Sequence, residues 1–384
     1  MAADVVVLGG GTGGVVVATS LARRLRRLGR PGRVVLVDRD LTYRFAPSFL
    51  WVMAGARRPE QVTADLRRLR RRGVELLQDE VVEVDLDRRV VRTTGEALGY
   101  RWLVLALGAE TVPGALPGFT EAACDVYALE GAERAARALA ELRGGRVVVL
   151  VSRLPYKCPA APYEAAFLAE AVLRRRGARA SVEVYTPEPF PMPTAGPEVG
   201  AAVQAMLARR GIGFSPGRSV ERIEPAAREL VFADGERVPF DLLLGIPPHR
   251  APEVVRASGL GGETGFVPVD RSTLLTSTEG VFAIGDVTAI PIAGGRFLPK
   301  AGVFAHAQAE VVARRIADEA RGRRPTAVFD GRGSCFVEMG DGVAAFATGD
   351  FYAEEGPRVR LRRAGRHWHL AKVAFERYWL RRWF

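Results

Sequence analysis

Short apolar runs alternate with amphipathic stretches along most of the chain. The first run, Asp4–Leu8, is rich in β-branched residues, and a glycine-rich turn and the helically periodic stretch Val15–Leu28 follow it. A second apolar run, Arg33–Val37, then ends on Asp38. Strand, turn, helix and strand in this order predict a βαβ unit, in which a helix joins two parallel strands.

The same alternation continues downstream. The expected strands are the pair within Val81–Val90, Trp102–Ala109, Val147–Val151, Asp241–Gly245 and Val281–Ile284, and the expected helices are Ala160–Arg176 and Gly302–Ala320. No repeat of solenoid period and no low-complexity linker interrupts them. The pattern predicts a doubly wound α/β fold with two Rossmann-like domains. We expect the first at 1–112 and 240–325, the second at 113–239, and a C-terminal region at 326–384.

The turn Gly9–Gly14 has the spacing of a dinucleotide-binding fingerprint. Gly9 permits the tight turn, Gly11 lets the backbone approach the phosphates, and Gly14 lets helix and strand pack closely. The N-terminus of the following helix then faces the anion. Asp38 ends the second strand, where its carboxylate can accept hydrogen bonds from a ribose hydroxyl. The first domain is therefore predicted to bind a dinucleotide cofactor.

The net charge of +11 raises the question of a nucleic-acid partner. The arginines recur along the chain, as in 23–27, 67–72 and 174–176, and are typical of solvated helix faces, so no nucleic acid is expected.

No apolar stretch approaches the roughly 18 residues of a membrane span, and no export signal follows Met1, which predicts a cytoplasmic location. Three cysteines are too few for a disulfide scaffold and too widely spaced for a zinc site.

Three ordered landmarks resemble the two-dinucleotide-fold flavoprotein disulfide reductase superfamily. They are the glycine turn, the strand end Leu105–Ala109, and Val281–Asp286. The resemblance implies FAD as the cofactor, with Asp286 at its ribityl chain. The residues implied to contact FAD are Gly9, Gly11, Thr12, Gly13, Gly14, Asp38, Arg39, Val82, Ala106, Leu107, Gly108, Gly285, Asp286, Lys300 and Ala301.

The second domain lacks a glycine turn of its own. Its first strand, Arg146–Val151, is followed by Ser152–Pro159, and no glycine occurs between Gly145 and Gly177. Without glycine, and with two prolines, this turn cannot bring its backbone close to a second pyrophosphate. NAD(P)H is therefore not the expected electron donor.

A cysteine stands where the second glycine turn would lie. Cys158 in Tyr156–Glu164 resembles the cysteine motif of sulfide:quinone oxidoreductases and of the flavoprotein subunit of flavocytochrome c sulfide dehydrogenase. Cys335 in Gly333–Glu338 stands in the place of the second family cysteine. Two further stretches agree, namely Ile246–Ala251 and Leu298–Val303.

The resemblance implies FAD-dependent oxidation of sulfide to sulfane sulfur or polysulfide by a redox pair, Cys158 and Cys335, with electrons passed to a membrane quinone. It also implies Glu164 as an acid/base group. A positive charge on Lys300 would stabilise the reduced flavin. Lys157 would lower the pKa of Cys158 if both side chains faced the same way.

Other candidates remain open. Cys124 is either a structural thiol or the third cysteine that some relatives carry near the flavin. His249 lies in a proline-rich turn, where it would assist proton transfer, whereas His306 is expected in the core or behind the flavin. The histidines that these families commonly place near the cysteines are missing, which leaves the proton path open.

The last nineteen residues predict an amphipathic helix. Its aromatic residues Trp368, Phe375, Trp379 and Trp383 share a face, and Lys372, Arg377, Arg381 and Arg382 supply positive charge. Such a helix suits the surface of an anionic membrane, where a lipid-soluble quinone is collected. The alternatives are a helix that closes the core and a dimer interface, and homo-oligomerisation stays open.

Three other functions compete with a peripheral membrane sulfide:quinone oxidoreductase. One is a sulfide dehydrogenase that passes electrons to a cytochrome, and another is a non-catalytic, membrane-bound flavoprotein that senses or sequesters sulfur. The third is a type II NADH dehydrogenase, against which the missing second glycine turn argues.

Overall fold

The first sheet carries the N-terminal βαβ unit. The computed structural model describes residues 2–27, 29 and 32–384, and in this part of the chain the sheet holds seven strands. They are β1 (Ala2–Leu8), β2 (Val34–Asp38), β5 (Glu75–Gln78), β6 (Val81–Asp85), β7 (Val90–Thr93), β8 (Ala97–Leu105) and β20 (Val281–Ala283). β1 lies between β2 and β8 and is parallel to both.

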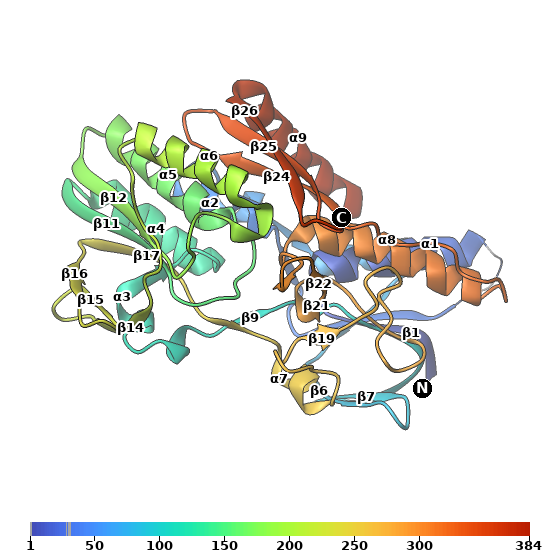
Figure 1. The fold of residues 1–384 in the computed structure, drawn as a ribbon. Coiled ribbons are helices and arrows are strands. Elements are labelled where there is room, and N and C mark those ends of the chain that lie inside the picture. The colour runs from blue at the N-terminus through green and yellow to red at the C-terminus, as the bar shows by residue number, and fades with distance from the viewer. Residues whose placement is uncertain (1, 28, 30–31) are drawn as a thin grey trace.

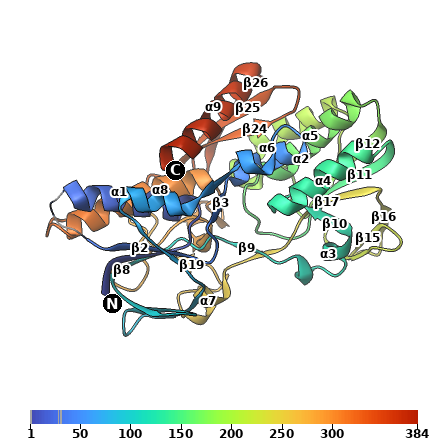
Figure 2. The same ribbon diagram turned by 180° about the vertical axis from the view of Figure 1, so that it is seen from behind.

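Two helices cover one face of this sheet. The helices α1 (Thr12–Arg27) and α8 (Gly302–Glu319) lie side by side, as Figures 1 and 2 show. The β1 residues from Val5 to Leu8 are fully buried, as expected for a parallel strand covered on both faces. The predicted βαβ unit is confirmed, although Leu28 lies outside the described residues.

The second sheet is parallel throughout. Its order is β10 (Ala123–Asp125), β17 (Leu242–Ile246), β11 (Gly144–Val151), β12 (Arg179–Tyr185) and β13 (Gly213–Ser215). The predicted boundary at residue 240 had assigned β17 to the first domain. This is corrected, because β17 pairs on both edges within the second sheet and is fully buried there.

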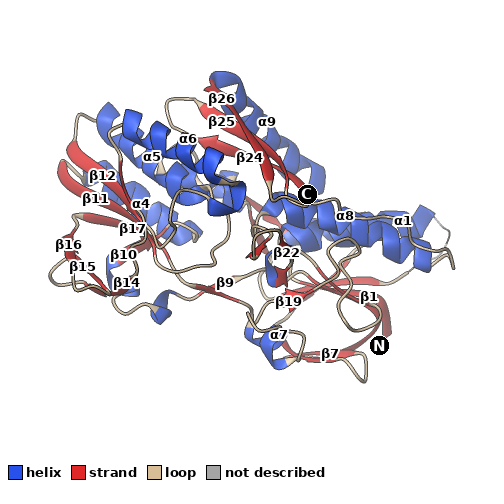
Figure 3. Ribbon diagram, in the orientation of Figure 1, coloured by secondary structure: helices blue, strands red, loops and turns tan. Residues whose placement is uncertain are grey.

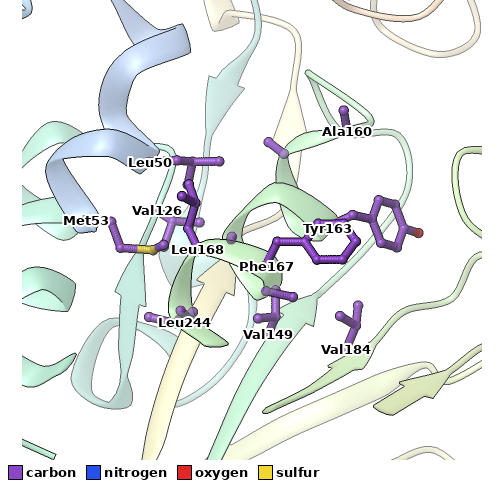
Figure 4. Close-up of a cluster of buried hydrophobic side chains, with 14 of the residues drawn as sticks. Leu50, Met53, Val126, Val149, Ala160, Tyr163, Phe167, Leu168, Val184 and Leu244 are labelled. Carbon is purple, nitrogen blue, oxygen red and sulfur yellow. The ribbon is translucent and has the colours of Figure 1, made fainter. Parts of the chain in front are cut away.

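The core of the second domain lies around α5 (Ala161–Arg175). Figure 4 shows Tyr163, Phe167 and Leu168 of this helix among side chains of the second sheet. Leu50 and Met53 come from α2 (Phe49–Met53), a helix encoded between strands of the first sheet, and they join the same cluster. The two domains therefore share one apolar core at this point.

The C-terminal region forms a third layer. Its antiparallel strands are β24 (Arg332–Glu338), β25 (Ala344–Asp350) and β26 (Arg358–Gly365), and α9 (Arg366–Trp383) packs against them (Figure 3). β24 contacts both α5 and α8 and so touches both domains. The predicted fold class, two Rossmann-like domains followed by a region that ends in an amphipathic helix, is confirmed.

Part of the α9 face that was predicted to meet a membrane instead faces the protein interior. Trp379 and Trp383, which were expected to face a membrane, are 3% and 4% exposed. Their rings pack against the ring of His306 on α8, with centroids 5.3 and 5.7 Å away. This part of α9 closes the core of the first domain, because the tryptophans fill the space above α8.

The remaining elements complete the fold. The helices are α3 (Phe119–Ala122), α4 (Leu129–Glu141), α6 (Pro197–Arg209) and α7 (Glu253–Ala257); the strands are β3 (Thr42–Arg44), β4 (Thr63–Asp65), β9 (Glu110–Thr111), β14 (Val220–Glu224), β15 (Glu229–Phe232), β16 (Arg237–Pro239), β18 (His249–Arg250), β19 (Val267–Pro268), β21 (Thr288–Ala289), β22 (Pro291–Ile292) and β23 (Arg296–Phe297). The pair β9 and β18 is antiparallel and lies where the chain passes between the two domains (Figure 1).

Candidate active site

A cavity of about 580 Å³ extends from the glycine turn to the start of α5. Predicted site residues that line it are Gly9, Gly11, Thr12, Gly13, Asp38, Arg39, Ala106, Leu107, Gly108, Lys157, Cys158, Glu164, Gly285, Asp286, Lys300 and Ala301. One cavity thus brings together the predicted cofactor contacts and the first cysteine.

The glycine turn has the shape that a pyrophosphate requires. Gly9 has a φ of +97°, and a Cβ added there would lie 2.6 Å from the carbonyl oxygen of Ala106. A Cβ on Gly14 would lie 1.7 Å from the carbonyl oxygen of Gly9, so Gly14 makes a close packing contact and does not line the cavity. A Cβ on Gly11 would meet nothing within 4 Å, which leaves open space beside the backbone.

Two carboxylates that line the cavity offer acceptors for hydroxyl groups. Asp38 accepts a hydrogen bond from the backbone N–H of Gly10, which places its carboxylate beside the glycine turn. Oδ1 of Asp286 is buried and has no hydrogen-bond partner among the described residues. Burial raises the pKa of Asp286, although Lys157 and Lys300 act against this. A ribityl hydroxyl would satisfy this carboxylate, and the residues present therefore fit FAD.

One predicted contact is displaced by a single residue. Val82 is 52% exposed, and its neighbour Val81 lines the cavity. Successive side chains on a strand point to opposite sides, so a shift of one position along β6 exchanges the two. The structure places Val81, rather than Val82, at the cavity.

The ammonium group of Lys300 is held by backbone oxygens. Its Nζ donates to the carbonyl oxygens of Asp286 at 2.7 Å and Thr288 at 3.0 Å, and it lies 3.3 Å from the ring centroid of Phe266. Burial lowers its pKa to about 8, despite the opposing effect of the Asp286 carboxylate. The positive charge lies at the cavity, as predicted, and also ties together the turn that carries Asp286.

Cys158 has a constrained backbone. Its φ is +53°, a left-handed conformation that is uncommon for residues other than glycine. Its N–H donates to the carbonyl oxygen of Lys300 at 2.7 Å, and its own carbonyl accepts from the Tyr127 hydroxyl at 3.1 Å. These bonds hold the cysteine against the cavity wall.

Cys335 raises the pKa of Cys158 although the two cysteines lie in different parts of the fold. Burial raises the pKa of Cys158 well above its usual value, and the nearby Cys335 raises it further. Burial also raises the pKa of Cys335, on β24, to about 12. Both are free thiols in the structure. Burial therefore favours the protonated thiols of the reduced pair.

The predicted effect of Lys157 is corrected. Its Nζ lies 3.4 Å from the carbonyl oxygen of Ala109 and 6.0 Å from the Tyr127 ring centroid, and it acts on the carboxyl of Asp286 rather than on the thiol. The cation that lowers the pKa of both cysteines is Lys372.

Lys372 forms a buried ion pair with Glu164. The Nζ and Oε1 atoms are 2.8 Å apart, and Oε1 also accepts from the backbone N–H of Glu338 at 2.8 Å. Lys372 is 6% exposed and was predicted to face membrane headgroups; that prediction is wrong. A regular spacing of charges on α9 predicted a solvated face, and nothing local showed that a carboxylate 208 residues away would bind one of them.

Cys335 does not line the cavity, whereas Cys158 does. Three other candidates also lie outside the cavity lining. Cys124, on β10, is partly buried, and burial raises its pKa, with Arg134 acting against this. His249 is buried, and its Nδ1 lies 2.8 Å from the carbonyl oxygen of Pro247. Burial lowers its pKa to about 3, so at neutral pH it is uncharged. His306 packs between tryptophans and is half-buried, in keeping with its expected place near the core.

Aromatic residues fill the part of the second domain where a nucleotide ribose would bind. In a dinucleotide fold, a carboxylate after the second strand accepts the ribose hydroxyls. Glu188, which follows β12, is 3% exposed and accepts hydrogen bonds from the hydroxyls of Tyr163 and Thr186. Burial raises the pKa of Glu188 to about 7. The protein itself satisfies the carboxylate that a ribose would need.

Comparisons with known proteins agree with this geometry. The profile of the pyridine nucleotide-disulphide oxidoreductase family matches residues 3–151 and 163–310. Sulfide-quinone reductase of Aquifex aeolicus is 28% identical over 402 residues, which cover 99% of this chain and 91% of the relative. Mitochondrial sulfide:quinone oxidoreductase of Mus musculus is 28% identical over 364 residues, which cover 91% of this chain and 79% of the relative.

A solved structure is also similar over almost the whole chain. The X-ray structure of the sulfide:quinone oxidoreductase from Aquifex aeolicus superposes with a TM-score of 0.88 at 26% identity, covering 99% of this chain and 91% of that one. The similarity therefore includes the C-terminal layer, which the family profile does not match.

Proposed function

Because the chain belongs to the pyridine nucleotide-disulphide oxidoreductase family, we propose that it oxidises sulfide with bound FAD and passes the electrons to a quinone. The chain is an FAD-binding oxidoreductase, and its predicted resemblance to the sulfide:quinone oxidoreductases is confirmed. The observation that carries the proposal is the position of Cys158 at the cavity that fits FAD, with Cys335 close enough to alter its pKa.

The first step starts from the oxidised cysteine pair. Burial keeps the reduced thiols protonated, and a thiol is a poor nucleophile compared with a thiolate. Hydrosulfide supplies the nucleophile instead. It attacks one sulfur of the Cys158–Cys335 bridge, the S–S bond breaks, and a persulfide forms on one cysteine and a thiolate on the other.

The second step returns the pair to its bridged form. When bound, FAD accepts the two electrons released as the persulfide and the thiolate re-form a sulfur bridge. The left-handed backbone of Cys158 and its bond to Lys300 hold the reacting sulfur against the cavity during this step. Glu164 lies at the cavity beside both cysteines and is the group positioned to exchange a proton with them.

The proposed electron acceptor is a membrane quinone, collected at α9. Of the helices in the described part of the chain, none has the length and apolarity of a membrane span. Leu370, Phe375 and Tyr378 are large, exposed hydrophobic side chains on α9, and the exposed Arg377 and Arg381 flank them. Apolar residues bordered by arginines suit peripheral attachment at anionic headgroups.

Anaerobic titration tests the proposal. The oxidised, flavin-loaded protein is mixed with sulfide or, separately, with NADH, and bleaching of the flavin absorbance is followed before a soluble quinone analogue is added. Sulfide should bleach the flavin and the quinone should restore its absorbance. Bleaching by NADH and not by sulfide would overturn the proposal. If a cytochrome reoxidised the reduced flavin and a quinone did not, the proposed electron acceptor would be wrong, but the proposed oxidation of sulfide would stand.

Cysteine variants test the mechanism within the same assay. Cys158→Ser and Cys335→Ser should each abolish rapid bleaching by sulfide, because a single thiol cannot form the bridge that hydrosulfide attacks. Cys124→Ser is the matched control, since Cys124 lies on β10 and is not part of the proposed bridge. Retention of sulfide bleaching in Cys158→Ser would exclude the bridge mechanism.

A further inference from the structure

A row of ionisable side chains extends from the cavity towards the surface. We call it the polar chain, and it consists of Glu164, Lys372, Glu338 and His369. Glu164 lines the cavity and contacts Lys372 at 2.8 Å, and Nδ1 of His369 lies 2.7 Å from Oε1 of Glu338. The side chain of His369 is 27% exposed, whereas that of Glu338 is 1% exposed. The polar chain thus has one end at the cysteines and the other at solvent.

The middle of the polar chain has an unsatisfied acceptor. Oε2 of Glu338 is buried and has no hydrogen-bond partner among the described residues. It lies 3.9 Å from Nζ of Lys372, which is longer than a hydrogen bond. Lysine has a flexible stem and three donors. A small rotation of Lys372, or one intervening water molecule, would complete a continuous hydrogen-bonded row.

The surroundings of the polar chain keep its charges in place. The indole ring of Trp51 is 2% exposed, and the ring centroid lies 4.9 Å from Nζ of Lys372 and 5.7 Å from the imidazole centroid of His369. Arg57 lies on the same indole, 4.6 Å from its centroid, and its Nε forms an ion pair with Oε1 of Glu376 at 2.8 Å. Arg57 is therefore paired with Glu376 and does not compete with Lys372 for Glu338.

Both buried partners have pKa values shifted towards their protonated forms. Burial raises the pKa of Glu338, with Lys372 and His369 acting against this. Burial alone would lower the pKa of Lys372, but Glu164 and Glu338 raise it above its usual value. A carboxylate with a raised pKa next to an imidazole can pass a proton on to it.

The reaction of the proposed function requires such a path. Neutral hydrogen sulfide that enters the site carries two protons. It loses the first when it becomes the hydrosulfide that attacks the bridge, and oxidation of the hydrosulfide to sulfane sulfur releases the second together with two electrons. Oxidised FAD, when bound, would take up both electrons and one proton, so the other proton has to leave a buried site. Glu164 is the cavity-lining member of the polar chain and stands at the start of its route to solvent.

We propose that the polar chain is a proton relay that connects the cysteine site with solvent at His369. The proposal rests on the proposed function, because it assumes that sulfide delivers the proton. It assigns Glu338 and His369, which no motif of the sequence indicated, as residues that act through Lys372 and Glu164. It also supplies the proton path that the missing family histidines left open.

A single-turnover experiment tests the relay. The oxidised, flavin-loaded protein is mixed with sulfide anaerobically in weak buffer, while flavin absorbance and a pH-indicator dye are followed together. His369→Ala should slow proton release by roughly a hundredfold, the lower end of what one positioned acid/base group contributes. Added imidazole should restore most of the rate, which loss of a purely structural side chain would not permit. His369→Gln serves if the alanine variant does not fold.

The matched control is His367→Ala, on the same helix. His367 is exposed and packs on Trp368, with ring centroids 4.8 Å apart. Its removal should leave proton release unchanged, with or without imidazole. Proton release at the wild-type rate in His369→Ala, or a slow rate that imidazole does not restore, would overturn the relay.

A second readout does not depend on turnover with sulfide. Infrared difference spectra are recorded as the bound flavin is reduced by light. A signal from a protonated, buried carboxylic acid should appear and should be absent in Glu338→Gln. A spectrum unchanged by this substitution would remove Glu338 from the path. Failure of sulfide to bleach the wild-type flavin would instead overturn the proposed function, so the two failures are distinguishable.

Discussion

The backbone N–H of Cys158 donates a hydrogen bond to the carbonyl oxygen of Lys300, and the two atoms are 2.7 Å apart. The bond joins the loop that carries Cys158 to the loop that carries Lys300. The ammonium group of Lys300 in turn donates a hydrogen bond to the carbonyl oxygen of Asp286. The Tyr127 hydroxyl supports the same place by donating to the carbonyl oxygens of Lys157 at 2.7 Å and Cys158 at 3.1 Å. Thiol and cofactor loop are thereby held as one unit.

Tyr127→Phe should loosen this unit. The substitution keeps the ring but leaves carbonyl oxygens without their donor, and we expect the free energy of unfolding to fall by about 1–2 kcal/mol. Urea unfolding measures this loss. Tyr378→Phe is the matched control, because Tyr378 is 59% exposed and its hydroxyl is in water, so its change should stay within about 0.5 kcal/mol. Equal losses in both variants would contradict the support that we assign to Tyr127.

Two glycines of the cofactor turn should respond differently to alanine. Gly14→Ala would place a methyl group 1.7 Å from the carbonyl oxygen of Gly9, so the turn must open, at a cost of about 3 kcal/mol or more in unfolding free energy. Gly11→Ala meets nothing within 4 Å, so the flavin-free protein should unfold as the wild type does. It should nevertheless lose flavin, since the methyl group occupies the space left for phosphate.

Two measurements separate these effects. Urea unfolding of the flavin-free proteins reports the turn, and the ratio of flavin to protein absorbance after purification reports the cofactor. A Gly11→Ala protein with a full complement of flavin would show that the open side of Gly11 is not where the pyrophosphate binds.

Much of the fold is predictable because buried parallel strands are marked in the sequence itself. A strand covered on both faces must be apolar throughout, and the runs at 5–8 and 147–151 are fully buried as expected. The glycine turn is equally predictable from the sequence, since the positive φ of Gly9 and the close packing at Gly14 exclude side chains at these positions. For the buried strands and the glycine turn, the physical constraint acts on the same residues that form the sequence pattern, so the sequence alone is enough to predict them.

The unpredicted parts depend on contacts between distant segments. Trp379 and Trp383 share a helix face, as the spacing indicates, but only packing on α8 decides that this face points inward. Lys372 is buried because Glu164 binds it, and neither residue shows this locally. Glu338 and His369 were not predicted as site residues for the same reason. Their roles exist only once β24 and α9 are folded together.

The buried His249 should make stability depend on acid. Burial, with the cations Lys157 and Lys300, holds its folded-state pKa at about 3, below the usual value of about 6.5. Between these values the unfolded chain binds a proton that the folded protein does not, so stability is lost as the pH falls. The loss is at most about 1.4 kcal/mol per pH unit, or about 2 kcal/mol from pH 6.5 to 5.

His249→Asn tests this dependence. The asparagine amide can replace the contact of Nδ1 with Pro247 but does not titrate. Unfolding free energies of wild type and variant should therefore converge by about 2 kcal/mol between pH 6.5 and 5. His367→Asn, an exposed histidine, should run parallel to the wild type. A parallel course for His249→Asn would show that His249 is protonated in the folded state.

The exposed face of α9 should control attachment to a membrane. Leu370 and Tyr378 are 64% and 59% exposed and lie two turns apart on one face. Replacing both with serine removes apolar surface without touching the buried Trp379, so the fold should persist. Binding to anionic vesicles of phosphatidylglycerol should weaken by roughly tenfold for each side chain.

Co-sedimentation with vesicles measures this binding, and Leu154→Ser provides the control, since Leu154 is also a 51% exposed apolar residue but lies in the turn after β11. Higher salt should weaken binding of the wild type, because Arg377 and Arg381 border the apolar face and salt screens their attraction to lipid phosphates. If the double variant sediments as the wild type does, α9 is not the attachment site, and its exposed residues belong to another interface.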